Sequence, residues 1–116
     1  GKWVKGPDYK LVAAVKEALG ELNIIAEDLG FMTNEVIELR ERTGFPGMKI
    51  LQFAFNPNDE SIDSPHLAPN NSVMYTGTHD NNTVLGWYRD EIDDATREYM
   101  AQYTNRKEYE TVPHAM

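Results

Sequence analysis

The chain has 116 residues, of which 41% are apolar, and it carries a formal net charge of −8 and no cysteine. This length suits one small domain with a buried core. The acidic balance argues against nucleic acid as a partner, because phosphate binding needs a basic surface. No apolar run approaches the roughly 18 residues of a membrane-spanning helix, so no membrane contact is expected. Without cysteines no disulfide can form, which fits the reducing cytoplasm, where we expect the protein to reside.

The first half of the chain predicts two helices with a short strand between them. Asp8 is a typical N-cap residue for a helix that ends near Gly20. The segment 23–26 then predicts a short buried strand. A second helix is expected from Thr33, as its N-cap, to the stop signal at Gly44. The apolar residues of the first helix share one face at helical spacing, at Leu11, Val15, Ala18, Leu19 and Leu22.

The second half predicts two strands and a third helix. The strands are expected at residues 48–55 and 73–76, separated by a long loop at 56–72 that is typical of a functional or mobile segment. The helix is expected within residues 90–103. This order of elements predicts an α/β protein with a parallel sheet and right-handed crossovers. The order alone fits both a barrel and an open sheet.

Two acidic turns follow strand-like runs and are the strongest candidates for a functional site. Glu27 and Asp28 come directly after Asn23-Ile24-Ile25-Ala26, and His79 and Asp80 follow the run at 73–75. Barrels of the α/β class carry their chemistry at the C-terminal ends of the strands. Acid/base cleavage of a sugar bond uses such carboxylates. The two turns therefore predict a shared catalytic face.

Each acidic residue also has a structural interpretation. A carboxyl group buried without a partner favours its protonated form, which suits a general acid, and Glu27 follows apolar residues. Alternatively, Glu27 is a structural residue that pairs with an arginine or caps the next turn. Adjacent side chains on a strand point in opposite directions, so Asp28 is interpreted as a turn or cap residue and not as a second catalytic acid.

Five ordered blocks of sequence resemble one known family. They closely resemble the 4-α-glucanotransferases (amylomaltases, disproportionating enzymes) of glycoside hydrolase family 77, from about residue 1 to residue 88. Family members are several times longer than 116 residues, so we expect this chain to be an internal piece of such an enzyme. The blocks are Trp3-Val4-Lys5-Gly6-Pro7, Ile24-Ile25-Ala26-Glu27-Asp28-Leu29-Gly30, Gly44-Phe45-Pro46-Gly47-Met48-Lys49, Leu51-Gln52-Phe53-Ala54-Phe55 and Tyr75-Thr76-Gly77-Thr78-His79-Asp80-Asn81.

The resemblance implies a fold and a reaction. The fold would be a (β/α)8 TIM barrel, of which residues 1–116 would form part of the catalytic domain, with about strands five to seven and their helices. The reaction would be transfer of α-1,4-glucan segments between maltooligosaccharides by a retaining double displacement, with no metal or organic cofactor. The alternatives are a hydrolytic α-glucanase of the same clan and a non-catalytic glucan-binding or interaction module.

The resemblance also implies roles for four residues. Glu27 would be the general acid/base, Asp80 would stabilise the oxocarbenium-like transition state, and His79 would bind the donor sugar. Phe53 would contact sugar near the acceptor side, although the sequence alone favours core packing. For His79 the alternative is an ordinary structural histidine. A metal site is not expected, because His66 and His114 supply no recognisable ligand spacing. The tryptophans, Trp3 and Trp87, are interpreted as packing residues rather than sugar platforms.

Two departures and one absence qualify the resemblance. Asp8 stands where the family usually has glycine, which either alters a turn or improves the helix cap, and Asn82 stands where it usually has aspartate. The family's nucleophile belongs to an Arg-x-Asp-His strand, and this motif does not occur in the chain. We therefore expect the 116 residues alone to be inactive. We also expect them to self-associate, because strands taken from a barrel have open edges.

Overall fold

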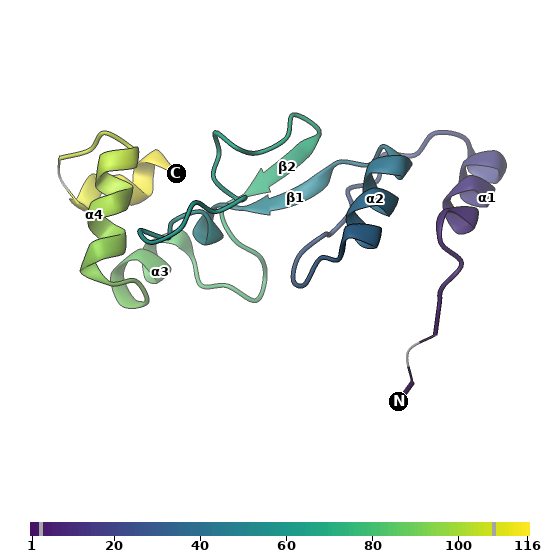
Figure 1. The fold of residues 1–116 in the computed structure, drawn as a ribbon. Coiled ribbons are helices and arrows are strands. Elements are labelled where there is room, and N and C mark those ends of the chain that lie inside the picture. Colours follow the sequence, from purple (N-terminus) through teal and green to yellow (C-terminus); the bar gives the residue numbers. More distant parts are fainter. Residues whose placement is uncertain (3, 108) are drawn as a thin grey trace. The chain divides into compact units, whose positions relative to one another are not determined.

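The computed structural model describes residues 1–2, 4–107 and 109–116 of the chain (Figure 1). Trp3 lies outside the described residues, so its predicted packing role is not addressed. The chain divides into two compact units, Gly1–Met48 and Lys49–Met116. Within the described ranges, no helix has both the length and the apolar character needed to cross a membrane.

The first unit holds two helices, which confirms both helix predictions for this half of the chain. Helix α1 spans Tyr9–Leu19, and helix α2 spans Asn34–Thr43 and ends at Gly44 in the left-handed conformation (φ 74°). The two helices pack against each other. The ammonium group of Lys16 on α1 donates a hydrogen bond of 3.0 Å to the carbonyl oxygen of Thr43. This bond also satisfies one of the carbonyls that a helix leaves free at its C-terminus.

The buried strand predicted at residues 23–26 is wrong. The segment makes a single parallel bridge, between Ala26 and Gly47. The hydrogen bond beside this bridge is donated by the amide of Ala26 to the carbonyl oxygen of Pro46, at 2.8 Å. A strand needs a continuing ladder of such bonds. Ile25 is 44% exposed, so the segment also lacks the apolar cover that the prediction required.

Apolar surface is poorly covered in the first unit. No side chain of α1 is buried, although its apolar residues share a face as predicted. Leu11 and Leu19 are 57% and 67% exposed, and Phe31, which precedes α2, is 95% exposed. The apolar face of α1 therefore follows the predicted period, but the described residues cover it only in part, since Val15 is half-buried and Leu11 and Leu19 stay exposed.

The strands β1 (Gly47–Ile50) and β2 (Ser72–Tyr75) form a two-stranded sheet, and their arrows run in the same direction in Figure 1. The prediction for β2 is confirmed. The strand predicted over residues 48–55 is only half correct, because it ends at Ile50 and a 3-10 turn, η1 (Leu51–Phe53), follows. The amide of Ala54 closes this turn by donating to the carbonyl oxygen of Leu51 at 3.0 Å.

The second unit contains two further helices and a final 3-10 segment. Helix α4 (Asp94–Tyr103) confirms the predicted third helix over most of its range. Helix α3 (Val84–Asp90) was not predicted. Thr83 caps α3 by accepting a hydrogen bond from the amide of Gly86 at 3.2 Å. The segment η2 (Tyr109–Ala115) packs against α3 and α4.

The core of the second unit lies between η1, α3, α4 and η2. Trp87 belongs to it, with 9% of its surface exposed, which confirms packing rather than sugar contact as its role. The buried apolar residues are Leu51, Ala54, Phe55, Trp87, Tyr88, Met100, Ala101 and Val112. The turn η1 therefore directs Leu51 and Ala54 inward, where a continued strand would have alternated its side chains.

The long loop between η1 and β2 is bonded to the rest of the second unit. The carboxylate of Asp63 accepts a hydrogen bond from the amide of Ile50 at 3.2 Å, and Ser64 is 1% exposed. The ring nitrogens of His66 lie 2.9 Å from the hydroxyl of Tyr103 and 3.0 Å from a carboxylate oxygen of Glu60. These bonds tie the loop to β1 and α4.

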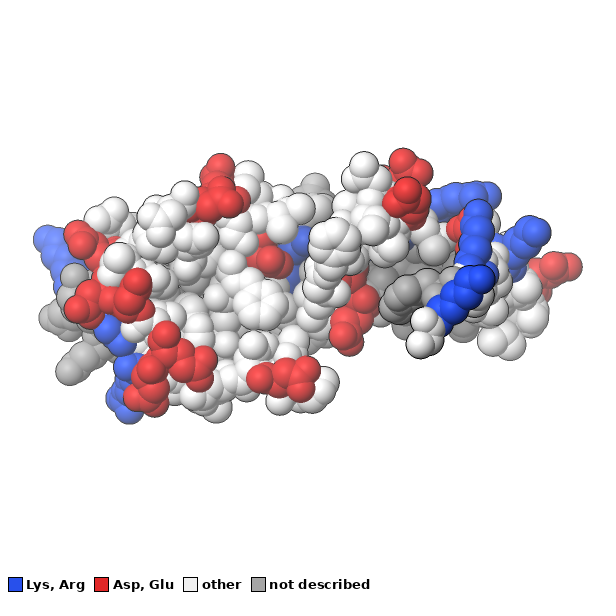
Figure 2. Space-filling view, turned by 60° about the horizontal axis from the view of Figure 1, so that its bottom comes forward, with Lys and Arg blue, Asp and Glu red and all other residues white. Residues whose placement is uncertain are grey.

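Charge is distributed broadly over the surface. Figure 2 shows acidic side chains scattered over the visible face, with wide uncharged areas among them. This distribution agrees with the formal charge of −8.

Candidate functional site

Glu27 lies in the first unit, in the turn after the Ala26 bridge, and its side chain is exposed. The burial from which the sequence predicted a general acid is therefore absent in the described residues. The structural alternative, a pair with arginine, does not involve Glu27 among the residues that the structure describes. Its carboxylate is left open to solvent and to any ligand that approaches this turn.

The neighbouring residue, Asp28, takes the structural role. Its Oδ2 lies 2.7 Å from Nη1 of Arg40 on α2, and its Oδ1 accepts a hydrogen bond of 2.7 Å from the amide of Met48. The side chains of Asp28 and Arg40 are 7% and 17% exposed. Adjacent side chains thus point opposite ways, as predicted, but the enclosed carboxylate is that of Asp28 and not that of Glu27.

His79 and Asp80 lie in the second unit, in the turn that follows β2. Nε2 of His79 is 3.2 Å from Oδ1 of Asp80, and the two side chains are 87% and 80% exposed. A side-chain contact this exposed contributes little to stability. The structure therefore brings these two predicted residues together at an open surface, where both can contact a ligand.

The turn itself is fixed by hydrogen bonds among its own residues. Oδ1 of Asn81 accepts from the amide and the hydroxyl of Thr78, at 2.8 and 2.9 Å. The amide of Asp80 donates to the hydroxyl oxygen of Thr78 at 3.2 Å, and the amide of Asn81 donates to the carbonyl of Thr78 at 3.1 Å. Side chains of Asn and Thr commonly stabilise turns in this way.

A buried glutamine forms a hydrogen bond with the backbone at the end of the same turn. Gln52 on η1 is 6% exposed, and its side-chain amide donates a hydrogen bond of 2.9 Å to the carbonyl oxygen of Asn82. Sequence reasoning did not single out Gln52 or Asn81 as site residues. The available signal for Gln52 was a single polar residue inside the apolar run at 51–55.

Asn82 joins the turn to helix α3. Its Nδ2 donates to a carboxylate oxygen of Glu91 at 2.9 Å, and its Oδ1 accepts from the amide of Thr83 at 2.8 Å. An aspartate, which is usual in the family, has no proton to donate when ionised and would face Glu91 with a like charge. The departure at this position therefore has a local structural explanation.

Phe53 lies on the 3-10 turn η1 and not on a strand, which corrects its predicted setting. It is 48% exposed, whereas its neighbours Leu51 and Gln52 are buried. The prediction of core packing from sequence alone is therefore wrong for this chain. An aromatic ring that is half exposed has a face available for stacking.

The second departure, Asp8, occupies a conformation that favours glycine. Its φ and ψ are 58° and −150°, which is strained for a residue with a Cβ. Its Oδ1 accepts a hydrogen bond of 2.7 Å from the amide of Tyr9 at the start of α1. The substitution thus provides a cap in a backbone geometry that glycine adopts at lower cost.

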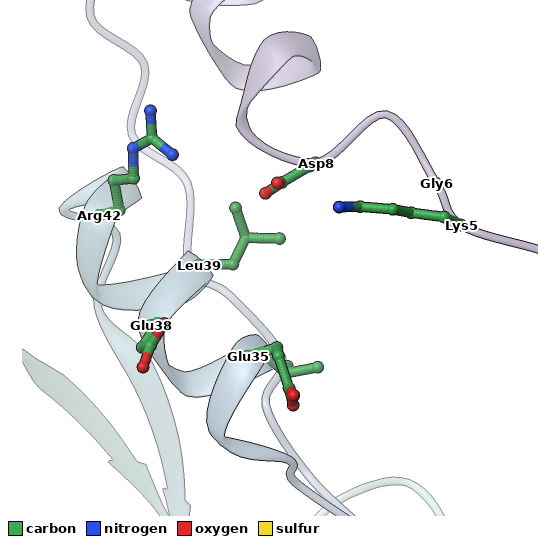
Figure 3. A pocket seen from close by; sticks show the side chains of 8 residues that line it. Lys5, Gly6, Asp8, Glu35, Glu38, Leu39 and Arg42 are labelled. Atoms are coloured by element: carbon green, nitrogen blue, oxygen red, sulfur yellow. The ribbon is translucent and has the colours of Figure 1, made fainter.

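A surface pocket of about 500 Å³ lies in the first unit, against α2 (Figure 3). None of the four predicted site residues lines it. Its walls carry both charges, with Lys5 and Arg42 opposed by Asp8, Glu35 and Glu38. Hydrogen bonds from the backbone amide of Glu35 itself and from the Thr33 hydroxyl lower the pKa of the Glu35 carboxyl. These contacts are those of a helix N-terminus, so the pocket adds nothing to the candidate site.

The comparisons with known proteins agree with one another. The glycoside hydrolase family 77 model, described as 4-alpha-glucanotransferase, matches residues 1–116. A 4-alpha-glucanotransferase of Streptococcus pneumoniae is 91% identical over 116 residues, which are 100% of this chain and 23% of that protein. A 4-alpha-glucanotransferase of Thermus thermophilus is 46% identical over 123 residues, covering 100% of this chain and 24% of that protein.

A solved structure has the same fold over almost the whole chain. It is an amylomaltase from Streptococcus agalactiae in complex with acarbose, with a TM-score of 0.86 and 40% sequence identity. The match covers 99% of this chain and 24% of that chain. The chain therefore spans about a quarter of the length of the relatives that it matches. Its helices and small parallel sheet correspond to part of a larger α/β structure.

Proposed function

Because the chain belongs to the 4-alpha-glucanotransferase family, glycoside hydrolase family 77, we propose that the protein containing it transfers α-1,4-glucan segments between maltooligosaccharides. The observation that carries this proposal is the exposed pair His79–Asp80 in the fixed turn after β2, within a chain that matches the family over its whole length. Further support comes from the solved relative, which is an amylomaltase bound to acarbose.

The reaction would proceed in two displacement steps. In the first, Glu27 gives its proton to the glycosidic oxygen as a second carboxylate bonds to the sugar carbon, and the leaving glucan departs with a free hydroxyl. In the second, Glu27 takes the proton from the 4-hydroxyl of another glucan, whose oxygen displaces the enzyme carboxylate. Part of the protein outside residues 1–116 would supply that second carboxylate. Glu27 is exposed, as contact with substrate in both proton transfers requires, although the burial that would favour its protonated form is absent in the described residues.

The other three residues would bind and stabilise the sugar. The ionised carboxylate of Asp80 would stabilise positive charge that develops on the ring as the bond breaks. His79 would donate a hydrogen bond to the donor sugar. The exposed ring of Phe53 would stack on a sugar near the acceptor side. The open position of all three side chains supports these roles.

In the full-length enzyme, we propose that these residues belong to about strands five to seven of a (β/α)8 barrel. The parallel bridge of Ala26 and the parallel pairing of β1 with β2 support this arrangement. Because barrel strands end at one rim, the carboxylates of Glu27 and Asp80 would open into one cleft. A structure of the full-length enzyme with the two groups at opposite ends of the sheet would contradict this proposal.

Incubation of the full-length protein with maltotriose tests the function. Transfer yields glucose together with a ladder of longer maltooligosaccharides. Hydrolysis would yield only glucose and maltose, and a binding module would leave maltotriose unchanged while still retaining it on an affinity column. Either of these last two outcomes would overturn the proposal. An Asp80→Asn variant, which keeps the size of the side chain but not its charge, should form the ladder far more slowly.

A further inference from the structure

The side chain of Gln52 is a buried polar group directly beneath the turn that carries His79 and Asp80. Gln52 is 6% exposed and is preceded and followed by the apolar residues Leu51 and Phe53. A buried amide is costly unless it forms hydrogen bonds. The hydrogen-bond partner of the Gln52 side chain therefore indicates its role in the fold.

Gln52 holds the chain on both sides of the turn. Its backbone amide donates to the carbonyl oxygen of Thr76 at 3.2 Å, just after β2. Its side-chain Nε2 donates to the carbonyl oxygen of Asn82 at 2.9 Å, just before α3. The residues between these two anchors include His79 and Asp80. A single residue of η1 thus fixes the entry and the exit of this turn.

Close packing at Gly77 shows how tightly the turn rests on Gln52. A Cβ atom placed on Gly77 would lie 3.0 Å from Nε2 of Gln52 and 3.2 Å from Cβ of Asn81. These distances are shorter than ordinary contacts between carbon and nitrogen or carbon and carbon. A side chain at Gly77 would therefore press against the glutamine amide and against Asn81 unless they shifted by a few tenths of an ångström.

His79 and Asp80 depend on this backbone for their orientation. Within residues 1–2, 4–107 and 109–116, the polar contact of their side chains is the one they make with each other, at 3.2 Å. Both are at least 80% exposed, so packing does not hold them. Their placement in front of a ligand is therefore set by the turn and by whatever anchors its ends.

We propose that Gln52 is a positioning residue that fixes the turn bearing His79 and Asp80 through its hydrogen bond to the Asn82 carbonyl. The proposal rests on the proposed function, because it assigns Gln52 an effect on Asp80 and none on the substrate directly. Loss of the bond lets the turn shift, and a misplacement of about 1 Å can reduce a rate on the order of 100-fold.

The test uses the full-length enzyme with Gln52→Met, which keeps the length of the side chain and removes its donor. The matched control is Gln102→Met on the exposed face of α4. We expect Gln52→Met to reduce kcat/KM for maltotriose about tenfold or more, mainly through kcat, because Asp80 acts in the transition state. Amide hydrogen exchange in a peptide covering residues 76–83 should become faster in Gln52→Met and stay unchanged in the control.

A second variant tests whether the hydrogen-bond donor at this position is what matters. Gln52→Glu is the same shape but donates a hydrogen bond to the Asn82 carbonyl only when protonated. Its activity, divided by that of the unmodified enzyme at the same pH, should therefore rise as the pH falls. This variant also serves if Gln52→Met does not fold.

The outcomes separate the two proposals. Activity of Gln52→Met within about twofold of the unmodified enzyme would overturn the positioning role, as would an unchanged exchange rate at residues 76–83. An unmodified enzyme that forms no ladder would overturn the proposed function alone, and the exchange measurement would still decide the positioning role. Full activity of the Asp80→Asn variant, in an enzyme that forms the ladder, would overturn both the role of Asp80 in the transition state and the positioning role of Gln52.

Discussion

Oδ2 of Asp28 lies 2.7 Å from Nη1 of Arg40, and both side chains are largely closed to solvent. The same carboxylate receives the amide of Met48 at 2.7 Å, so Asp28 joins the Glu27 turn to α2 and to the start of β1. The pair leaves no room at Gly47, where a Cβ atom would lie 2.5 Å from Oδ2 of Asp28 and 2.7 Å from Nη1 of Arg40.

This relationship predicts that Gly47→Ala destabilises the protein. The added methyl must displace the ion pair, and overpacking of this kind costs about 1–3 kcal/mol. Asp28→Ala should cost more, about 3–5 kcal/mol, because it removes the enclosed partner of Arg40 and leaves only the exposed carboxylate of Glu41, at 3.8 Å. Chemical denaturation of the full-length enzyme measures both. Gly6→Ala is the matched control, since a Cβ atom there meets no atom within 4 Å. A Gly47→Ala variant as stable as this control would contradict the account.

The sequence allowed the features that depend on chain neighbours to be predicted, but not the contacts between residues far apart in the chain. Local signals sufficed for α1 and α2, because Asp8, Thr33, Gly20 and Gly44 mark their ends. The alternation of adjacent side chains correctly separated Asp28 from Glu27, although the predicted strand is absent and the enclosed carboxylate is Asp28. The proximity of His79 to Asp80 follows from their adjacency. These features depend on neighbours in the chain, which a single sequence displays.

Features that depend on distant residues were missed or wrong. The strand expected at 23–26 required a ladder that the described residues do not supply beyond Ala26. The strand expected through residue 55 stops at Ile50, because the core needs Leu51 and Ala54 on the same side of the chain. The contact between Gln52 and the Asn82 carbonyl joins residues 30 apart, and no local pattern indicates it.

The N-cap of α4 predicts a pH dependence of stability. Hydrogen bonds from the hydroxyl of Thr96 and then from its backbone amide lower the pKa of Asp93, with a smaller contribution from Arg97. In the unfolded chain the pKa of Asp93 is about 3.9, and above this pH its charged form stabilises the fold fully. This contribution is lost as the pH falls through the lower pKa that Asp93 has in the folded protein.

Asp93→Asn keeps the capping oxygen and removes this charge, so it isolates the effect. Its Tm should lie below that of the unmodified enzyme near neutral pH, and the difference should shrink as the pH falls below about 4. Thermal unfolding across this range measures the difference. Asp59→Asn, which changes an exposed carboxylate in the loop, controls for net charge. A Tm difference for Asp93→Asn that stays constant into strong acid would show that the charge is not responsible.

The isolated 116-residue chain should self-associate. Phe31 is 95% exposed, Val4 81% and Leu19 67%, and within the described residues β1 and β2 form a two-stranded sheet whose edges are covered only by the single bridge of Ala26 to Gly47. Apolar surface and unpaired edges of this kind promote association. Light scattering should give a mass above the monomer value of 13.2 kDa that increases with concentration. A sharp monomer mass at high concentration, with cooperative thermal unfolding, would show that the chain is a self-sufficient domain.

The same isolated chain should not disproportionate maltotriose. A retaining mechanism needs two carboxylates about 5–5.5 Å apart, and the family's nucleophile motif does not occur among the 116 residues. Loss of one member of a catalytic unit typically costs several orders of magnitude in rate. Chromatography of the products measures the activity. Turnover at an ordinary enzymatic rate would require a nucleophile within the chain. Asp28 and Asp63 would be poor candidates, because both are held by structural hydrogen bonds.

The central claim is that Glu27 is the acid/base of a glucan transferase, and a comparison of two donor substrates tests it most directly. In the full-length enzyme, Glu27→Gln removes the acid that protonates the glycosidic oxygen of the leaving glucan. Transfer from maltotriose should therefore fall by several orders of magnitude. An α-maltosyl fluoride donor needs no such proton, because fluoride leaves readily, so the same variant should still release fluoride in its first turnover. A loss equally large for both donors, or no loss for maltotriose, would contradict the assignment of Glu27.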